Sequence, residues 1–207
     1  RLRTVGYGNW ESAIIESLVN AAVIRYLLEH ESDFEIANQL RMSRVNGGFI
    51  WLDQLVAIFG AYENNREAYP NFSSLLTTLL EGYFSDLSKR IDFEVQKFEK
   101  IAPIVVSIFP LTDTTVSINP NTTHLKITFD KILDDKLKFS VRAGSLGKDH
   151  NPVTKVLGLS ENGTVLTLEV ELKPNRDYEF MLPGRRYKTK NGYQMKDYTV
   201  VFKTGNL

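Results

Sequence analysis

Hydrophobic residues in the first hundred positions recur mostly at the three- and four-residue spacing of α-helices. The stretch from Trp10 to Glu29 is almost continuously apolar and holds no Gly or Pro, which predicts one uninterrupted helix. A second helix is predicted to begin at the capping-box pattern Ser32–Glu35 and to reach about Met42. The run Asn46-Gly47-Gly48 is expected to end it.

A third helix is predicted from about Leu52 to Asn64. Its apolar side chains fall on one stripe, formed by Leu52, Leu55, Val56 and Phe59. Four aromatic side chains of this half are predicted to lie in the core, namely Trp10, Tyr26, Trp51 and Phe59. These elements together predict a small helical assembly.

A fourth helical region is predicted after Pro70, where Asn71 or Ser73 can act as the N-cap. It reaches roughly Lys100, which is long for a single helix in a globular protein. Two positions inside the region, Gly82 and Asp92, are therefore expected to bend or divide it.

Residues 103–205 follow a different pattern, in which apolar and polar residues alternate over short runs separated by turn residues. The strongest hairpin feature is Asn162-Gly163, which lies between two alternating runs. The predicted strands are Ile104–Phe109, His124–Phe129, Lys138–Arg142, Val153–Leu157, Val165–Val170, Asp177–Leu182 and Thr199–Lys203. Seven short strands in about 100 residues are typical of a two-sheet sandwich.

The change of pattern divides the chain near Ala102-Pro103, because Pro103 ends any helix that reaches it. The predicted fold class is α+β in two separate domains. A helical subdomain covers residues 1–101, and an all-β sandwich covers residues 103–207.

Composition narrows the classes of function. The net charge is zero, with 10 Lys+Arg against 14 Asp+Glu in residues 1–102 and 15 against 11 in residues 103–207. So mild a split does not favour a nucleic-acid partner. No run of about 18 apolar residues occurs, so no membrane span is predicted. The absence of cysteine excludes disulfides, thiolate metal sites and cysteine nucleophiles.

Four motifs in the second half resemble the bacterial surface-layer type of immunoglobulin-like domain. They are Pro110–Pro120, Thr128-Phe129-Asp130, the L-x-P-N-x-x-Y corner Leu172–Tyr178, and the F-x-T ending Phe202–Thr204. Asp113 stands where that family usually has Gly. The resemblance covers essentially all of residues 103–206. It implies an immunoglobulin-like sandwich that serves as an accessory module in exported or surface bacterial proteins and is rarely catalytic.

Two stretches of the first half, YGNWESAIIESLVNAAVIRYL and GGFIWLDQLVAIFGAYENNREAYPNF, resemble the C-terminal part of an uncharacterised family of exported bacterial proteins. That family is similar to gluzincin metallopeptidases, which use an H-E-x-x-H helix and a glutamate on a later helix as the third zinc ligand. The resemblance implies Glu16 as that ligand, although Ile15, Val19 and Asn20 replace the family's asparagine, serine and aspartate. The H-E-x-x-H helix would precede Arg1. This chain is therefore expected to be a fragment that is inactive alone, with zinc bound only in the full-length protein.

Glu16 has a second interpretation that does not involve metal. A carboxylate in so apolar a helix is expected to point into the protein or a cleft, where it needs a partner. A structural ion pair with an arginine would supply that partner equally well.

Tyr62 and Arg66, at the end of the third predicted helix, are the catalytic candidates, because hydrogen-bond donors of this kind can stabilise an oxyanion. The alternative is structural, since Glu63 and Glu67 flank Arg66 and indicate an ion network at the helix end. The histidines stand alone and predict no metal site; they are His30, His124 and His150.

The predicted function is the C-terminal portion of an exported bacterial zinc-metallopeptidase-like protein, periplasmic or on the cell surface, with an unknown protein or peptide as partner. The competing prediction is a non-catalytic cell-surface binding or adhesion protein with an immunoglobulin-like module. An H-E-x-x-H motif upstream of Arg1 would favour the first, and its absence would remove it.

Overall fold

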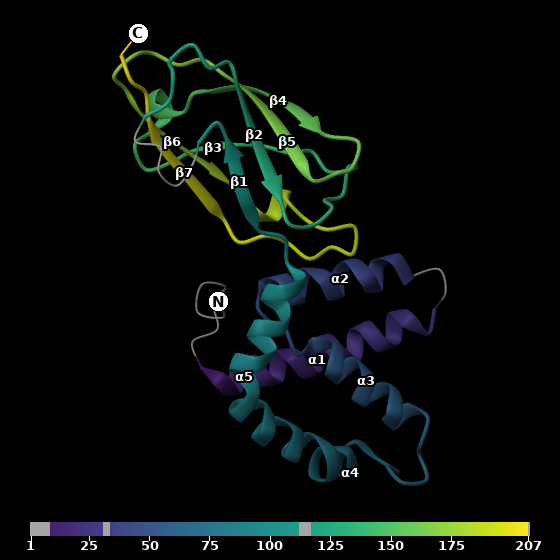
Figure 1. The fold of residues 1–207 in the computed structure, drawn as a ribbon. Coiled ribbons are helices and arrows are strands. Elements are labelled where there is room, and N and C mark those ends of the chain that lie inside the picture. Colours follow the sequence, from purple (N-terminus) through teal and green to yellow (C-terminus); the bar gives the residue numbers. More distant parts are fainter. Residues whose placement is uncertain (1–8, 31–33, 112–116, 207) are drawn as a thin grey trace. The chain divides into compact units, whose positions relative to one another are not determined.

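The computed structural model describes residues 9–30, 34–111 and 117–206. The chain forms two compact units, Arg1–Glu99 and Lys100–Leu207, drawn in Figure 1. Within the described residues no helix has both the length and the hydrophobicity that crossing a bilayer requires.

The first unit is helical throughout. Its elements are α1 (Trp10–Leu28), α2 (Phe34–Gly47), α3 (Leu52–Glu63), α4 (Phe72–Leu75), a π-helical segment (Leu76–Leu80) and α5 (Glu81–Ile101). Helix α1 packs against both α2 and α3 (Figure 1). The stripe predicted for α3 is buried at Leu52, Leu55 and Phe59, so the helical pattern is confirmed there.

Helix α2 ends five residues later than predicted, at Gly47. Gly48 has a φ of 121°, the left-handed region that closes a helix. Its N–H donates to the Val45 carbonyl (3.1 Å), and the next N–H, of Phe49, donates to the Arg44 carbonyl (3.1 Å). This pair of bonds is the Schellman motif, which fixes Gly48 as the first residue beyond the helix. The predicted capping residues Ser32 and Asp33 lie outside the described residues.

The fourth helical region begins as predicted at Asn71. Its side chain accepts a hydrogen bond from the Ser74 N–H (3.0 Å), and the Ser74 hydroxyl lies 3.4 Å from the Asn71 nitrogen, which completes a capping box. The expected division at Gly82 or Asp92 is wrong, because α5 runs through both positions. The irregularity falls earlier, in the π-helical turns of Leu76–Leu80.

Helix α1 buries its small and polar side and exposes its large aliphatic side. The buried residues are Ala13, Ser17, Asn20, Ala21 and Ile24. Ser17 accepts a hydrogen bond from the Trp51 indole N–H (3.0 Å) and donates to the Ala13 carbonyl (2.6 Å), so the buried hydroxyl is satisfied. Of the four aromatic residues predicted for the core, Trp51 and Phe59 are buried, but Trp10 and Tyr26 are exposed by 39% and 62%.

The second unit is a sandwich of two antiparallel sheets. Its strands among the described residues are β1 (Val105–Phe109), β2 (His124–Phe129), β3 (Arg142–Ala143), β4 (Val153–Leu159), β5 (Val165–Val170), β6 (Asp177–Leu182) and β7 (Tyr198–Lys203). One sheet has the order β1-β2-β5-β4 and the other has the order β3-β6-β7. With the strands lettered A to G, these orders are ABED and CFG, the arrangement of a constant-type immunoglobulin domain.

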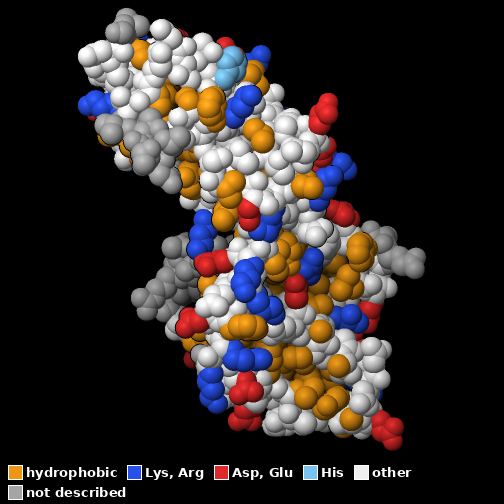
Figure 2. Space-filling view, in the orientation of Figure 1, with side chains coloured by type: hydrophobic (Ala, Val, Ile, Leu, Met, Phe, Trp, Pro, Cys, Tyr) orange, Lys and Arg blue, Asp and Glu red, His pale blue; other side chains and the backbone are white. Residues whose placement is uncertain are grey.

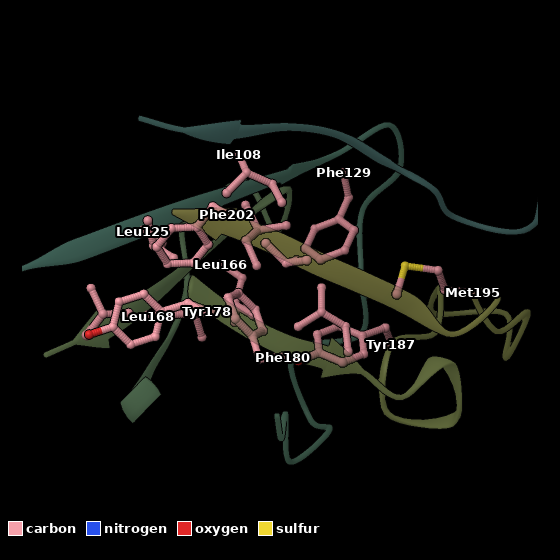
Figure 3. Packing of buried hydrophobic residues seen from close by; sticks show 14 of the residues in the cluster. Ile108, Leu125, Phe129, Leu166, Leu168, Tyr178, Phe180, Tyr187, Met195 and Phe202 are labelled. Atoms are coloured by element: carbon pink, nitrogen blue, oxygen red, sulfur yellow. The ribbon is translucent and has the colours of Figure 1, made fainter. Parts of the chain in front are cut away.

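Alternating side chains from both sheets meet in one core (Figure 3). Leu125 and Phe129 of β2 face Phe180 and Phe202 of the other sheet, and all four are buried. Ile127 of β2 belongs to the same core. In β2 and β5, residues that alternate between apolar and polar in the sequence also alternate between buried and less buried positions in the structure. Most of the predicted strands are confirmed within two residues for this reason.

Strand β3 is the exception, because it covers only Arg142–Ala143 rather than Lys138–Arg142. Only these two residues pair with β6, opposite Met181 and Phe180. The preceding carbonyl of Ser140 instead accepts a hydrogen bond from the Tyr187 hydroxyl (2.9 Å). This carbonyl is therefore paired with a side chain rather than with a neighbouring strand.

Candidate functional site

The L-x-P-N-x-x-Y corner joins β5 to β6 and brings its tyrosine back onto its own backbone. The Tyr178 hydroxyl oxygen accepts a hydrogen bond from the Lys173 N–H (2.6 Å), five residues upstream. Asn175 at the bend has a φ of 52°, a left-handed value that asparagine tolerates. This is the tyrosine corner of immunoglobulin-like sandwiches, so the corner motif is a structural device.

The F-x-T ending closes the same corner from the last strand. The buried Thr204 hydroxyl donates to the Lys173 carbonyl (2.5 Å) and accepts from the Arg176 N–H (3.0 Å). At the other end of the sandwich, Asp130 of the T-F-D motif accepts from the Ile104 N–H (2.8 Å) where the chain enters β1. The hydrogen bonds of these motif residues give them a structural role in the sandwich. Asp113 of the first motif lies outside the described residues.

Three connections meet at the Asp130 end of the sandwich: β2–β3 (residues 130–141), β4–β5 (residues 160–164) and β6–β7 (residues 183–197). The Leu133 N–H donates to the Gly163 carbonyl (2.9 Å), and the Asp134 N–H donates to the Lys188 carbonyl (2.9 Å). The β2–β3 connection is therefore tied to both of the others. In immunoglobulin-like domains, loops gathered at one end in this way are available for recognition.

A groove of about 690 Å³ opens between these connections. Its walls are Ile132, Leu133, Leu137 and Phe139 from β2–β3 and Leu159–Gly163 from the β4–β5 hairpin, with Lys190 from β6–β7. We call this the loop-end groove. Its volume falls within the range of about 300–1,000 Å³ that is usual for ligand sites.

Gly163 makes this geometry possible. Its φ is 71°, and a Cβ there would lie 2.9 Å from Cγ2 of Ile132. Only glycine lets the hairpin turn while the half-exposed Ile132 side chain rests above it. The hairpin predicted at Asn162-Gly163 is confirmed, with a five-residue connection between β4 and β5 rather than a two-residue turn.

Two carboxylates line the loop-end groove, Asp135 from β2–β3 and Glu161 from the hairpin. Both residues are exposed, and neither side chain forms a hydrogen bond or ion pair with any residue that the structure describes. The neighbouring Asn162 side chain is occupied, because its Oδ1 accepts from the Thr164 hydroxyl (2.9 Å). The groove thus combines apolar walls with unpaired negative charge.

A different carboxylate, Glu179 on β6, is fully engaged. It accepts hydrogen bonds from the Leu146 N–H (2.7 Å) and from the Ser145 hydroxyl (2.9 Å), which hold the loop after β3 onto the sheet. These bonds, with a smaller contribution from the charge of His150, hold the pKa of Glu179 below its ordinary value. Glu179 is therefore an anchor for a loop.

Glu16 lies at the border between the buried and exposed sides of α1. Its side chain is 36% exposed, and one oxygen lies 3.9 Å from a guanidinium nitrogen of Arg44. The same oxygen accepts a hydrogen bond from the Asn20 amide (3.2 Å). The Glu16 carboxylate therefore already has polar neighbours within the helical unit.

The described residues do not complete a zinc site around Glu16, since nowhere among them do three His, Asp or Glu side chains gather at metal-binding distance. The Arg44 guanidinium also already supplies the positive charge beside this carboxylate. The ligand role of Glu16 depends on histidines from outside this sequence and stays a prediction.

Tyr62 and Arg66 lie together, but in a packing arrangement. The guanidinium carbon of Arg66 sits 3.8 Å from the centre of the Tyr62 ring, a cation–π contact. The Tyr62 ring is buried and meets Phe72 edge-on. The predicted pairing of Glu63 with Arg66 is wrong, because the Glu63 carboxylate accepts from Nε of Arg25 on α1 (2.7 Å).

One polar network in the helical unit was not foreseen from the sequence. The Tyr83 hydroxyl donates to the Gln54 side chain (2.8 Å), whose amide donates to the buried Glu94 (3.0 Å). Lys97 lies 3.3 Å from the second Glu94 oxygen. Burial, reinforced by the Glu94 charge, raises the pKa of Tyr83 well above its ordinary value. Each carboxylate oxygen of Glu94 has a partner, so the network fixes α3 against α5.

No protein-family model matches this chain, and no curated protein matches it in sequence. Three solved structures are similar to it in part. CopC from Methylosinus trichosporium OB3b is 16% identical, with a TM-score of 0.37, over 50% of this chain and 94% of its own. Native alpha-2-macroglobulin from Escherichia coli (domains MG0-NIE-MG1) is 22% identical, with a TM-score of 0.35, over 53% of this chain and 35% of its own. Surface layer protein SbsC (domains 1–6) is 15% identical, with a TM-score of 0.36, over 92% of this chain and 32% of its own.

Because all three TM-scores are below 0.5, we infer no function from these similarities. The chain spans about a third of the alpha-2-macroglobulin and SbsC structures that it matches. The immunoglobulin-like class of the second unit rests on its own strand order and tyrosine corner. The resemblance of the first half to metallopeptidases finds no support in these comparisons.

Proposed function

We propose that this chain is a non-catalytic binding module of an exported bacterial protein, and that the loop-end groove contacts its partner. The observation that carries the proposal is the groove itself, in which apolar walls and two unpaired carboxylates lie between three tied connections. Protein–ligand sites share this combination of apolar lining with a few placed polar groups.

The bacterial and cell-surface parts of the proposal rest on the motif resemblance. The corner, the F-x-T ending and the T-F-D motif each have the hydrogen bonds that an immunoglobulin-like sandwich needs. Domains of this type in surface proteins act as spacers or docking modules. We propose a module without catalytic activity because the three candidate site residues, Glu16, Tyr62 and Arg66, are all engaged in packing or pairing.

A peptide selection tests the groove. Random heptapeptides displayed on phage are selected on the immobilised full chain, on Ile132→Ser and on Leu157→Ser. Ile132 (54% exposed) lines the groove, whereas Leu157 (45% exposed) lies outside its lining and is the matched control. We expect peptide sequences that are enriched on the unsubstituted chain and on the Leu157→Ser variant but not on the Ile132→Ser variant. Equal enrichment on all three would exclude the groove as the binding site.

An activity assay tests the other half of the proposal. The chain incubated with zinc and unfolded casein is expected to give no cleavage. Proteolysis that a chelator abolishes would show that the module is an enzyme.

A further inference from the structure

We infer that the loop-end groove accepts a peptide segment in which an arginine or lysine adjoins an apolar residue. The inference rests on the proposed function and names the class of partner. It follows from the charges that line the groove and from the way in which they are placed.

The groove lining carries a net negative charge. Asp135 and Glu161 contribute two carboxylates, and Lys190 contributes one ammonium. Some carboxylates elsewhere in this protein are engaged: Glu63 binds Arg25, Asp53 binds Arg41, and Glu179 binds the Leu146 N–H and the Ser145 hydroxyl. Asp135 and Glu161 have no such partner among the described residues, so their charge is available to a ligand.

Apolar side chains form much of the lining of the same groove. Leu137 and Phe139 lie on one side, and Leu159 lies on the hairpin. Phe139 and Leu159 also pack on the sandwich core, which keeps these walls fixed. Arginine and lysine suit this arrangement, because their methylene stems cover apolar surface while the charged head stays near water and the carboxylates.

The opposite end of the sandwich offers a matched comparison. A cavity there is lined by Asp149 and Glu171 but also by Lys173 and Arg176, so its charges balance within the protein. Its lining is otherwise mostly polar, with Asn151 and Thr154 among its residues. Carboxylate-to-amide changes at that end alter the total charge equally without touching the loop-end groove.

The test is a titration of the full chain followed by amide nitrogen–proton NMR. The probes are acetyl-Leu-Arg-Leu-amide and its neutral counterpart acetyl-Leu-Gln-Leu-amide. We expect the arginine peptide to shift resonances of residues 132–139 and 158–163 and to bind more tightly than the glutamine peptide. Asp135→Asn with Glu161→Gln should weaken the arginine peptide by about fivefold to tenfold, the size expected for two exposed charge pairs, and leave the glutamine peptide unchanged.

The control pair Asp149→Asn with Glu171→Gln should leave both titrations unchanged, and spectra of both double variants should retain the dispersion of the folded chain. Equal binding of the two peptides would overturn the basic-segment inference while leaving the groove as a binding site. Shifts outside the groove, or no shifts at all, would also overturn it. Concentration-dependent groove shifts without peptide would identify a second copy as the occupant and contradict the inference. Failure of the proposed function is detected separately, by a phage selection in which the Ile132→Ser variant enriches the same peptides as the unsubstituted chain.

Discussion

The hydrogen bonds of a single residue, Thr204, explain why the F-x-T motif of the second half ends in threonine. The single hydroxyl of Thr204 both donates and accepts a hydrogen bond, and both bonds end on the backbone of the β5–β6 corner. Valine has the same shape without the hydroxyl, so it would leave the Arg176 N–H and the Lys173 carbonyl without this partner.

Thr204→Val is therefore expected to destabilise the sandwich by about 1–3 kcal/mol. Urea denaturation followed by the circular dichroism of β-sheet measures the loss. Thr199→Val, at an exposed position of β7, the strand that directly precedes Thr204, is the control and should change stability by less than about 0.5 kcal/mol. Equal effects of the two substitutions would contradict the role of Thr204.

Glu179 gives the stability of the sandwich a pH dependence of known sign. Because the folded state holds its pKa below the ordinary value of 4.5, the carboxylate stabilises the fold above that pH. The stabilisation is lost as the pH falls through the lower folded pKa. Glu179→Gln should lower the melting temperature of the sandwich at pH 7, and its difference from the unchanged chain should shrink towards pH 3.

Glu171→Gln is the control for that experiment, since Glu171 is exposed. It should show no comparable dependence on pH. A Glu179→Gln difference that is the same at pH 7 and pH 3 would show that the ionised carboxylate is not what holds the Ser145–Leu146 loop.

At the scale of elements, the sequence predicts best where local pattern and burial coincide. The strands β2, β5 and β6 have the predicted bounds, and in β2 and β5 the residues alternate between the buried and the outer face of the sheet. The end of α2 was predicted five residues too early, at about Met42, because the polar residues Ser43, Arg44 and Asn46 interrupt the apolar pattern although the helix continues to Gly47. Only the backbone conformation shows that Gly48 adopts the left-handed φ.

These two adjacent glycines make a direct test. Gly48→Ala is expected to destabilise the helical unit by about 1–2 kcal/mol, because alanine is strained at a φ of 121°. Gly47→Ala should be neutral or stabilising by up to about 1 kcal/mol, since its Cβ would meet nothing within 4 Å and the residue is helical. The fluorescence of Trp10 and Trp51, which are the two tryptophans of the chain, reports unfolding of this unit. The opposite order of stabilities would disprove the Schellman assignment.

The loop-end groove lay beyond sequence reasoning for a physical reason. Its walls come from three connections that are up to about sixty residues apart, and only hydrogen bonds such as Leu133 to Gly163 bring them together. The hairpin at Asn162-Gly163 was the one part of the site with a local pattern. Asp135 and Glu161 gave no pattern at all, because each is an ordinary charged loop residue until the fold brings both into the lining of one groove.

For the whole molecule, the predicted independence of the two halves can be tested on a fragment from Ile101 to Leu207. The sandwich has its own core, formed by residues of the second unit alone. The fragment should therefore unfold in one cooperative transition with a β-rich circular dichroism spectrum. A fragment that is unfolded in isolation would show that the two halves share a core.

Helix α1 leaves several large apolar side chains exposed to solvent within the helical unit. Its exposed residues include Ile15, Val19, Val23 and Tyr26, and Figure 2 shows hydrophobic side chains gathered on one face of this unit. The buried side of the helix is instead its small and polar side.

Hydrogen exchange of the full chain tests the central claim most directly. Exchange is measured by mass spectrometry with and without the heptapeptide most enriched in the phage selection. Binding at the loop-end groove predicts slower exchange in residues 130–139 and 158–164, with Ile132→Ser abolishing the effect and Leu157→Ser preserving it. Protection confined to the helical unit, or to the opposite end of the sandwich around Asp149 and Arg176, would contradict the account.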